Sequence, residues 1–181
     1  MSKKVLVITT SFRKGGNSDS LAEAFANGAR EAGNQVEVIS LANKNIGFCK
    51  GCLACVKTQR CVINDDAVEI VEKMKEADAI AFATPVYYYS VSGQLKTMFD
   101  RANPLYTSDY NFRDIYLLVS AAEDEKETVV GTQTAVQGWI DCYEKTHLAG
   151  TVFAGGVNNK GDIKGHHALE EAYRLGKKTA E

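Results

Sequence analysis

The fold is decided by the stretch Val5-Leu6-Val7-Ile8-Thr9-Thr10-Ser11-Phe12-Arg13-Lys14-Gly15-Gly16-Asn17-Ser18-Asp19-Ser20. An unbroken apolar run, 5–8, leads into a polar loop with adjacent glycines, and an amphipathic segment begins near Leu21. This order indicates a buried strand, a loop and the N-terminus of a helix. The first N–H groups of a helix have no partner within it, and the helix dipole places partial positive charge there. The loop is therefore suited to bind an anion.

The polar side chains of this loop are of the kinds that bind a phosphate monoester. Ser11, Ser18 and Ser20 carry hydroxyls, Asn17 carries an amide, and Arg13 carries a fixed positive charge. Together with backbone N–H groups, these side chains favour one terminal phosphate. The pattern predicts a site for a mononucleotide such as FMN.

Two better-known phosphate-binding patterns do not match this loop. Lys14 is followed by Gly15 and not by the serine or threonine of a Walker motif. Gly15 and Gly16 are adjacent, without the third glycine of the dinucleotide pattern. A plainer interpretation stays open, because Ser20 and Glu23 also fit the capping box of an ordinary helix.

Composition and charge restrict the class of protein. The chain has 181 residues, 45% apolar and 24% charged, which is typical of one globular domain spanning 1–181. Its net charge of -2 gives no sign of a nucleic-acid or membrane partner. The N-terminus lacks the apolar run of a signal peptide, so we expect a cytoplasmic protein. In that compartment the five cysteines favour metal or redox chemistry over disulfides.

Strand and helix patterns alternate along the chain. The expected strands span 5–8, 35–41, 79–83, 115–119 and 148–154. The expected helices cover about 21–32, 65–74, 92–101, 135–143 and 165–179. This alternation predicts a doubly wound five-stranded parallel sheet in the order 2-1-3-4-5, with helices on both faces.

A sheet of this order has its ligand site beyond the carboxyl ends of strands 1 and 3, where the winding reverses. That geometry places the loop at 84–93 beside the phosphate-type loop. Pro85 turns the chain away from its strand, and Val86 with the tyrosine run 87–89 offers flat apolar surface to a ring. Tyrosines are also common in half-buried loops, but a run of three at this position favours ring binding.

A long segment without a clear helix or strand pattern, about 42–64, holds four cysteines. They read Cys49-x2-Cys52-x2-Cys55-x5-Cys61. The first three have the spacing of ferredoxin-type iron–sulfur motifs, in which short turns bring the sulfurs together. Zinc is less favoured, because zinc sites usually pair two cysteine or histidine knuckles across a longer spacer.

Four groups of residues, spread over nearly the whole chain, match the motifs of one known family. They are 11–13 with 16–18, 49–55 with Cys61 and 65–66, 84–88 with Lys96 and 100–101, and 160–165 with 171–177. On these residues the chain resembles the flavodoxin-like NAD(P)H-dependent FMN reductases, and within them the iron–sulfur flavoprotein branch. Phe12 departs from the pattern, since the family usually has proline after the serine.

The resemblance implies a flavodoxin-like fold and a role for each motif. The residues that would hold the FMN phosphate are Ser11, Arg13, Asn17, Ser18 and Ser20. The residues that would cradle the isoalloxazine ring are Pro85, Val86, Tyr87 and Tyr88. The residues that would border the far edge of the ring are Ser120, Ala121, Ala122 and Glu123.

For the cysteines the resemblance leaves two outcomes open. Cys49, Cys52, Cys55 and Cys61 would either ligate a 4Fe–4S cluster or stay as thiols without a cluster, as in many relatives. The function implied is an FMN-dependent oxidoreductase that passes electrons from NAD(P)H, or a reduced carrier, to quinone, flavin or another small acceptor. The alternative is an electron carrier that exchanges electrons with ferredoxin through the cluster. Family members are usually dimers or tetramers, and no catalytic side chain is assigned.

Three other features carry weaker expectations. Cys142 falls on an apolar helix face, which predicts a buried small residue. Lys96, Asp100 and Arg101 form either an ion-pair group that fixes the helix after the tyrosine loop or a solvated face. The charged stretch 123–127 is either a lid over the flavin or an exposed acidic turn.

Overall fold

The computed structural model describes residues 2–180 and contains a five-stranded parallel sheet in the order β2-β1-β3-β4-β5. The strands are β1 (Lys4–Thr9), β2 (Gln35–Ser40), β3 (Ala79–Pro85), β4 (Asp114–Ser120) and β5 (His147–Ala154). The order and the parallel pairing confirm the doubly wound sheet that the alternating sequence pattern predicts. The winding reverses between β1 and β3.

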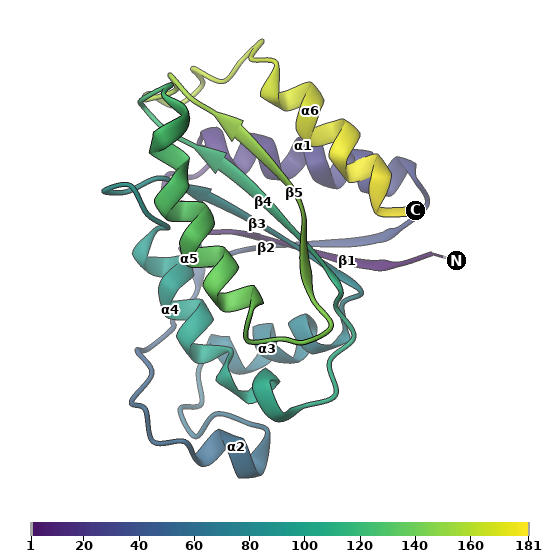
Figure 1. The fold of residues 1–181 in the computed structure, drawn as a ribbon, viewed down its shortest axis with the longest axis vertical. Coiled ribbons are helices and arrows are strands. Elements are labelled where there is room, and N and C mark those ends of the chain that lie inside the picture. Colours follow the sequence, from purple (N-terminus) through teal and green to yellow (C-terminus); the bar gives the residue numbers. More distant parts are fainter. Residues whose placement is uncertain (1, 181) are drawn as a thin grey trace.

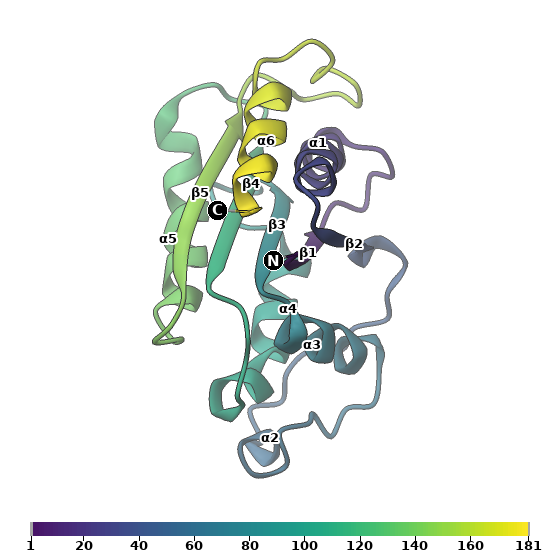
Figure 2. The same ribbon diagram turned by 90° about the vertical axis from the view of Figure 1, so that its right-hand side faces the viewer.

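Helices cover both faces of the sheet (Figures 1 and 2). One face carries α1 (Asn17–Glu31) and α6 (Ala168–Lys177). The other face carries α3 (Asp66–Glu76), α4 (Gly93–Arg101) and α5 (Val130–Ile140). A short helix, α2 (Ala54–Thr58), lies within the cysteine-containing segment. In Figure 1 it stands at the bottom of the view, below α3 and α4 and away from the arrowheads of the strands.

The two faces of the sheet bury separate apolar clusters. Because successive side chains of a strand point to opposite faces, Val5 and Val7 pack toward α1 and α6. Leu6 and Ile8 pack toward α3, α4 and α5. A central parallel strand is thus apolar at every position, which is why 5–8 reads as an unbroken run.

The helices α1 and α6 approach each other through two glycines. A Cβ atom on Gly28 would lie 2.0 Å from the carbonyl oxygen of Tyr173. A Cβ atom on Gly176 would lie 2.0 Å from the carbonyl oxygen of Phe25. Only glycine permits this backbone-to-backbone contact, which fixes the first helix of the chain against the last.

The predicted cap of α1 was wrong. The helix begins at Asn17, earlier than its apolar pattern indicates, and Gly16 is its N-cap residue. Asp19 therefore occupies the third helical position, where its carboxylate accepts a hydrogen bond of 3.3 Å from the Gly16 N–H. Ser20 and Glu23 lie inside the helix and do not cap it. Because α1 starts at Asn17, the free N–H groups of its first turn lie next to the loop that precedes the helix.

The segment after α4 contributes to the core, because Leu105 and Phe112 are buried. Phe112 stacks against Trp139 of α5, with ring centroids 5.9 Å apart, so this segment completes the core. The last helix begins at Ala168 and not at Gly165, whose φ of +77° is incompatible with a right-handed helix.

Candidate functional site

The phosphate-type loop and the tyrosine loop meet beyond the carboxyl ends of β1, β3 and β4, as predicted. They enclose a cavity of about 190 Å³. Its lining residues are Ser11, Arg13, Gly16, Asn17, Ser18, Pro85, Val86, Tyr87, Ser120, Ala121, Ala122, Val157, Asn158 and Lys160. An adjoining cavity of about 230 Å³ shares Val86, Ala121 and Ala122, and adds Tyr88, Tyr89, Glu123 and Thr128. We refer to the two cavities together as the crevice.

Buried hydroxyls join the elements at the base of the crevice. Thr10 donates to the carbonyl oxygen of Ala83 at 3.2 Å, which links the ends of β1 and β3. Ser92, the N-cap of α4, donates to Thr10 Oγ1 at 2.9 Å and also accepts from the Leu95 N–H. These contacts were not anticipated from the sequence. They hold the two loops at a fixed separation before any ligand binds.

The phosphate-type loop is preformed. The Ser11 hydroxyl accepts a hydrogen bond of 3.1 Å from the Arg13 N–H, and the Gly16 N–H donates to the Arg13 carbonyl at 2.8 Å. Gly15 has a φ of +65°, a left-handed conformation that glycine adopts without steric cost. Asp19 accepts from the Gly15 N–H at 2.9 Å. The loop therefore keeps its curvature while the first N–H groups of α1 point into it.

Asn17 positions a second loop. Its side-chain amide donates to the carbonyl oxygens of Val157 and Asn159 at 3.2 and 2.9 Å, and accepts from the Gly161 N–H at 3.2 Å. The amide predicted to contact phosphate is thus used in contacts within the protein. It brings the β5–α6 connection, 157–161, against the start of α1.

Two cations flank the phosphate-type loop. Arg13 Nη1 donates to the Asn158 carbonyl at 3.0 Å. Lys160 Nζ lies 3.3 Å from the position that a Cβ on Gly15 would take. Lys160 was not predicted as a site residue, although it lies in a motif of the family resemblance. A phosphate in this loop would sit between two positive charges.

One predicted phosphate residue is not brought to the cavity. The Ser20 hydroxyl donates back to the Gly16 carbonyl at 3.3 Å, within the first turn of α1. Ser11 and Ser18 do line the cavity, and both are buried.

The tyrosine loop is a tight hairpin. Tyr87 and Ser90 exchange backbone hydrogen bonds of 3.0 and 3.1 Å, which leaves Tyr88 and Tyr89 at the tip. These two have φ values of 49° and 59°, a left-handed conformation that costs non-glycine residues free energy. Tyr88 is fully exposed. A Cβ on Gly131 would lie 2.0 Å from the Tyr89 carbonyl oxygen, so the first turn of α5 packs directly against the hairpin.

The charged stretch after β4 closes one side of the crevice. Tyr89 Oη donates to Glu123 Oε1 at 3.1 Å, and Thr128 Oγ1 donates to Glu123 Oε2 at 3.3 Å. The hydrogen bond to Glu123 raises the pKa of the Tyr89 hydroxyl, and the negative charge of the carboxylate adds to the effect. Glu123 therefore ties the tyrosine hairpin to the turn that follows β4.

The four motif cysteines line a separate cavity of about 440 Å³. Cys49 and Cys52 are exposed, Cys61 is half-buried and Cys55 is buried. Cys142 lines the same cavity and is exposed, so its predicted burial was wrong. Because α5 ends at Ile140, the helical periodicity that placed Cys142 inward does not reach it.

The residues 2–180 hold no three histidine, cysteine, aspartate or glutamate side chains gathered closely enough to bind a metal ion as they stand. Thiolates are nevertheless the ligands that iron–sulfur clusters use, so the donor set suits a cluster. Two of the sulfurs already accept hydrogen bonds, Cys55 from Asn103 Nδ2 at 3.0 Å and Cys49 from the Gly51 N–H at 3.4 Å. The four sulfurs would have to move together to hold one cluster.

Arg101 does not join Lys96 and Asp100. Lys96 and Asp100 form an exposed ion pair of 2.7 Å on α4. Arg101 is buried, and its guanidinium pairs with both oxygens of Asp65, at 2.7 and 2.8 Å. Burial by itself would raise the pKa of Asp65, but the hydrogen bonds from Arg101, Gly47 and Ala67 hold that pKa below its ordinary value.

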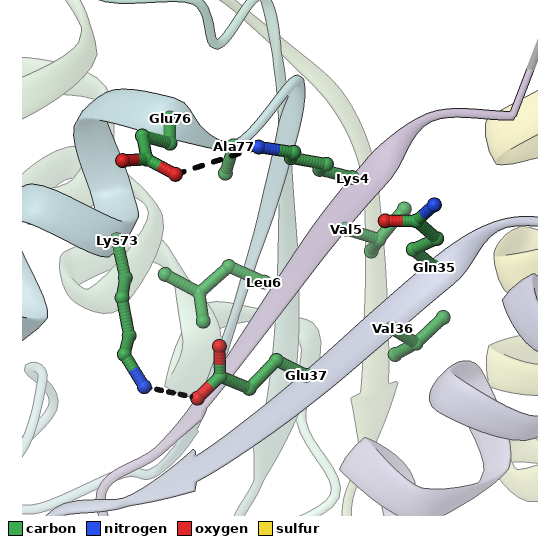
Figure 3. A pocket seen from close by; sticks show the side chains of 9 residues that line it. All are labelled: Lys4, Val5, Leu6, Gln35, Val36, Glu37, Lys73, Glu76 and Ala77. Carbon is green, nitrogen blue, oxygen red and sulfur yellow. Dashed lines mark hydrogen bonds and ion pairs between the residues drawn. The ribbon is translucent and has the colours of Figure 1, made fainter.

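Another groove, of about 300 Å³, lies at the amino ends of β1 and β2 (Figure 3). Its charged side chains already pair with one another, Lys73 with Glu37 and Lys4 with Glu76. It lies at the opposite end of β1 from the phosphate-type loop and lacks the hydroxyls and aromatic surface of the crevice. We assign no chemistry to it.

The fold is that of a flavodoxin-like protein, and the crevice lies at the switch point of its 2-1-3-4-5 sheet. The family described as NADPH-dependent FMN reductase matches residues 3–156. The chain belongs to this family, which confirms the resemblance carried by its motifs. It is an oxidoreductase of the NAD(P)H-dependent, flavin-using class.

Relatives support the iron–sulfur flavoprotein branch. An iron–sulfur flavoprotein of Archaeoglobus fulgidus is 32% identical over 185 residues, covering 98% of this chain and 79% of that protein. An iron–sulfur flavoprotein of Methanocaldococcus jannaschii is 45% identical over 102 residues. This match covers 56% of the present chain and 53%, about half, of the length of that relative.

Solved structures share the fold. The NAD(P)H:quinone oxidoreductase from Methanothermobacter marburgensis superposes with a TM-score of 0.78 at 21% identity, covering 100% of this chain and 98% of that one. Among residues 2–180, no helix is both long enough and apolar enough to cross a membrane.

Proposed function

We propose that the crevice holds FMN, with its phosphate in the loop 11–18 and its ring against the tyrosine hairpin. The observation that carries this proposal is the meeting of two loops of different chemistry. One is a hydroxyl-rich helix N-terminus flanked by cations, and the other is flat and aromatic. FMN has a dianionic phosphate at one end and a planar ring at the other, so it matches both.

At the phosphate end, the chain's residues supply charge and hydrogen-bond donors. The N–H groups of Asn17 and Ser18, at the start of α1, have no acceptor within the helix. Ser11 and Ser18 contribute hydroxyls, and Arg13 and Lys160 contribute positive charge. A flavin without the phosphate loses all of these contacts, so this end distinguishes FMN from riboflavin.

At the ring end, the walls combine apolar and aromatic side chains with Glu123 and Thr128. Val86, Ala121 and Ala122 line both cavities, and Tyr87 stands at the side. Bound FMN supplies the exchange of two electrons between a nicotinamide and an acceptor. The residues orient the ring and leave an open side, where a nicotinamide and then a quinone, flavin or other small acceptor bind in turn. We assign no side chain the role of acid or base.

The test is the affinity of Arg13→Ala for FMN and for riboflavin. We expect FMN to bind at least about tenfold more weakly and riboflavin to be affected little, because only FMN carries the dianion. Oxidation of NADH or NADPH with a quinone or ferricyanide then measures the reaction. Equal losses for the two flavins would remove Arg13 from the phosphate site.

A second function is supported by the cysteines. We propose that Cys49, Cys52, Cys55 and Cys61 ligate a 4Fe–4S cluster that exchanges electrons with a carrier such as ferredoxin. All four line one cavity, and the relatives named above are iron–sulfur flavoproteins. Anaerobic reconstitution followed by iron and sulfide analysis tests it, and a protein that takes up no iron under these conditions has no cluster.

We also propose assembly into a homodimer or homotetramer. Support comes from large apolar side chains that stand in solvent, among them Phe48 and Leu53 of the cysteine segment and Tyr88 of the hairpin. Light scattering on the FMN-loaded protein measures the number of subunits, and a monomer at micromolar concentration would contradict this proposal.

A further inference from the structure

The cysteine segment leaves the body of the protein and returns to it at one place. Gly47 lies just before the first cysteine of the motif, and Ile63 lies just after the last. The Arg101 side chain stands between them, donating from Nη1 to the Gly47 carbonyl at 2.7 Å and from Nη2 to the Ile63 carbonyl at 3.0 Å. One guanidinium therefore joins both limbs of the loop, which we call the cysteine loop (47–63).

Asp65 completes this junction. It holds both terminal nitrogens of Arg101, at 2.7 and 2.8 Å. It also accepts from the Gly47 N–H at 2.8 Å and, as the N-cap of α3, from the Ala67 N–H at 3.1 Å. The Arg101 side chain is 0% exposed and the Asp65 side chain 9%. A buried bidentate pair of this kind is rigid. Removing one partner leaves the other as an unpaired charge that is buried away from water.

The guanidinium also faces a cysteine. Arg101 Nε is buried and makes no regular hydrogen bond within residues 2–180. The hydrogen bonds to Asp65 raise the pKa of Arg101, burial opposes them, and the nearby Cys61 side chain adds a further favourable interaction. One N–H of the guanidinium is thus left without a partner at the base of the cysteine loop.

The same helix connects this junction to the crevice. Ser92 caps the start of α4 and bonds to Thr10 at the base of the crevice, while Arg101 is the last residue of that helix. Nine residues rising 1.5 Å each span about 13 Å. The position of the cysteine loop is therefore fixed relative to the crevice by one short helix, whose inner face is buried.

We propose that Arg101, held by Asp65, is the positioning residue of the cysteine loop. It clamps the two limbs together and places a buried positive charge at the base of the loop, so that the loop presents its thiolates to a metal centre. A cluster bound by four thiolates carries net negative charge, which a buried guanidinium compensates. This assignment of Arg101 rests on the proposed cluster function, whereas the clamping of the loop does not.

The experiment compares Asp65→Asn and Arg101→Lys with a matched control, Lys96→Ala. Asp65→Asn keeps the shape of the side chain and removes its charge. Arg101→Lys keeps the charge and removes the fork. Lys96→Ala breaks an exposed ion pair on the same helix, and such pairs contribute little. FMN content and NAD(P)H–ferricyanide activity report whether the rest of the molecule is intact.

Two measurements need no metal. In the cluster-free protein we expect amide exchange in the cysteine loop and alkylation of Cys61 to be at least about tenfold faster in both variants than in Lys96→Ala. In the reconstituted protein we expect iron release to a chelator to be about 10- to 100-fold faster.

Unchanged exchange and alkylation in both variants would overturn the proposal. A parallel loss of FMN would also overturn it, because Arg101 would then support the whole fold and not the loop. A wild-type protein that takes up no iron would end the cluster proposal and the assignment toward a metal centre. The exchange and alkylation results would still decide whether Arg101 clamps the loop.

Discussion

Tyr89 and Glu123 join the two walls of the crevice through a hydrogen bond of 3.1 Å from the phenol to the carboxylate. Tyr89 comes from the hairpin after β3, and Glu123 from the turn after β4. The strands hold these loops side by side, and the side chains set the width of the opening between them. A ring entering the crevice meets a site whose shape is already fixed on this side.

Replacing Tyr89 by phenylalanine tests this contact. The ring stays and the hydrogen bond is lost, so we expect FMN to bind roughly fivefold more weakly. Fluorescence quenching of FMN measures the affinity. Tyr106→Phe, at another exposed tyrosine, is the control and should change nothing. Identical affinities for the two variants would show that the contact does not shape the site.

Gly131→Ala should displace the tyrosine hairpin, which packs against the first turn of α5. The added Cβ would lie 2.0 Å from the Tyr89 carbonyl, so the hairpin has to move. We expect FMN affinity to fall by about tenfold or more, a loss of at least about 1.4 kcal/mol. Gly138→Ala, in the same helix with open space around it, should leave affinity unchanged. The same affinity in both variants would mean that the hairpin does not depend on its contact with α5.

Gly176→Ala tests the contact between α1 and α6. Its Cβ would lie 2.0 Å from the Phe25 carbonyl, a backbone atom with no room to move, and overpacking of this kind costs about 1–3 kcal/mol. Gly138→Ala should instead stabilise by up to about 1 kcal/mol, because alanine favours an exposed helix position. Thermal unfolding of the FMN-free variants, followed by circular dichroism, compares them. A melting temperature for Gly176→Ala equal to that of the wild type would contradict the close approach.

Acid should weaken the Arg101–Asp65 pair. The pKa of Asp65 is lowered in the folded protein, so the folded state binds its proton less readily than the unfolded state, whose value is about 3.9. The stabilisation is therefore complete above about pH 5 and is lost as the pH falls through the folded pKa. Urea unfolding of the wild type and Asp65→Asn should show a difference at neutral pH that shrinks toward about pH 2. A difference that does not change with pH would contradict this assignment.

The parts of the molecule that the sequence predicts are those set by local pattern and general topology. The run 5–8 followed by a polar loop gives β1, the phosphate-type loop and α1. The alternation of strands and helices gives the sheet order, and with it the meeting of the loop and the tyrosines. Each of these inferences depends on neighbours in the chain or on a rule common to parallel sheets.

The rest depends on contacts between residues far apart in the chain. Lys160 and Asn158 reach the loop of Arg13 only after the whole sheet has formed, so their neighbours in the chain do not assign them to that loop, although Lys160 lies in a motif of the family resemblance. Lys96 stands four residues from Asp100, as an ion pair on a helix face requires, and the sequence pattern groups the neighbouring Arg101 with them. Its actual partner, Asp65, is 36 residues away.

A crystal structure of the protein soaked with FMN shows directly whether the crevice is the flavin site. We expect the phosphate at the start of α1, in contact with Ser11 and Ser18 and flanked by Arg13 and Lys160. The ring should lie between the tyrosine hairpin and Ala121. Crystals that take up no FMN because the protein's own side chains fill the crevice would rule out this site, as would FMN bound at any other place.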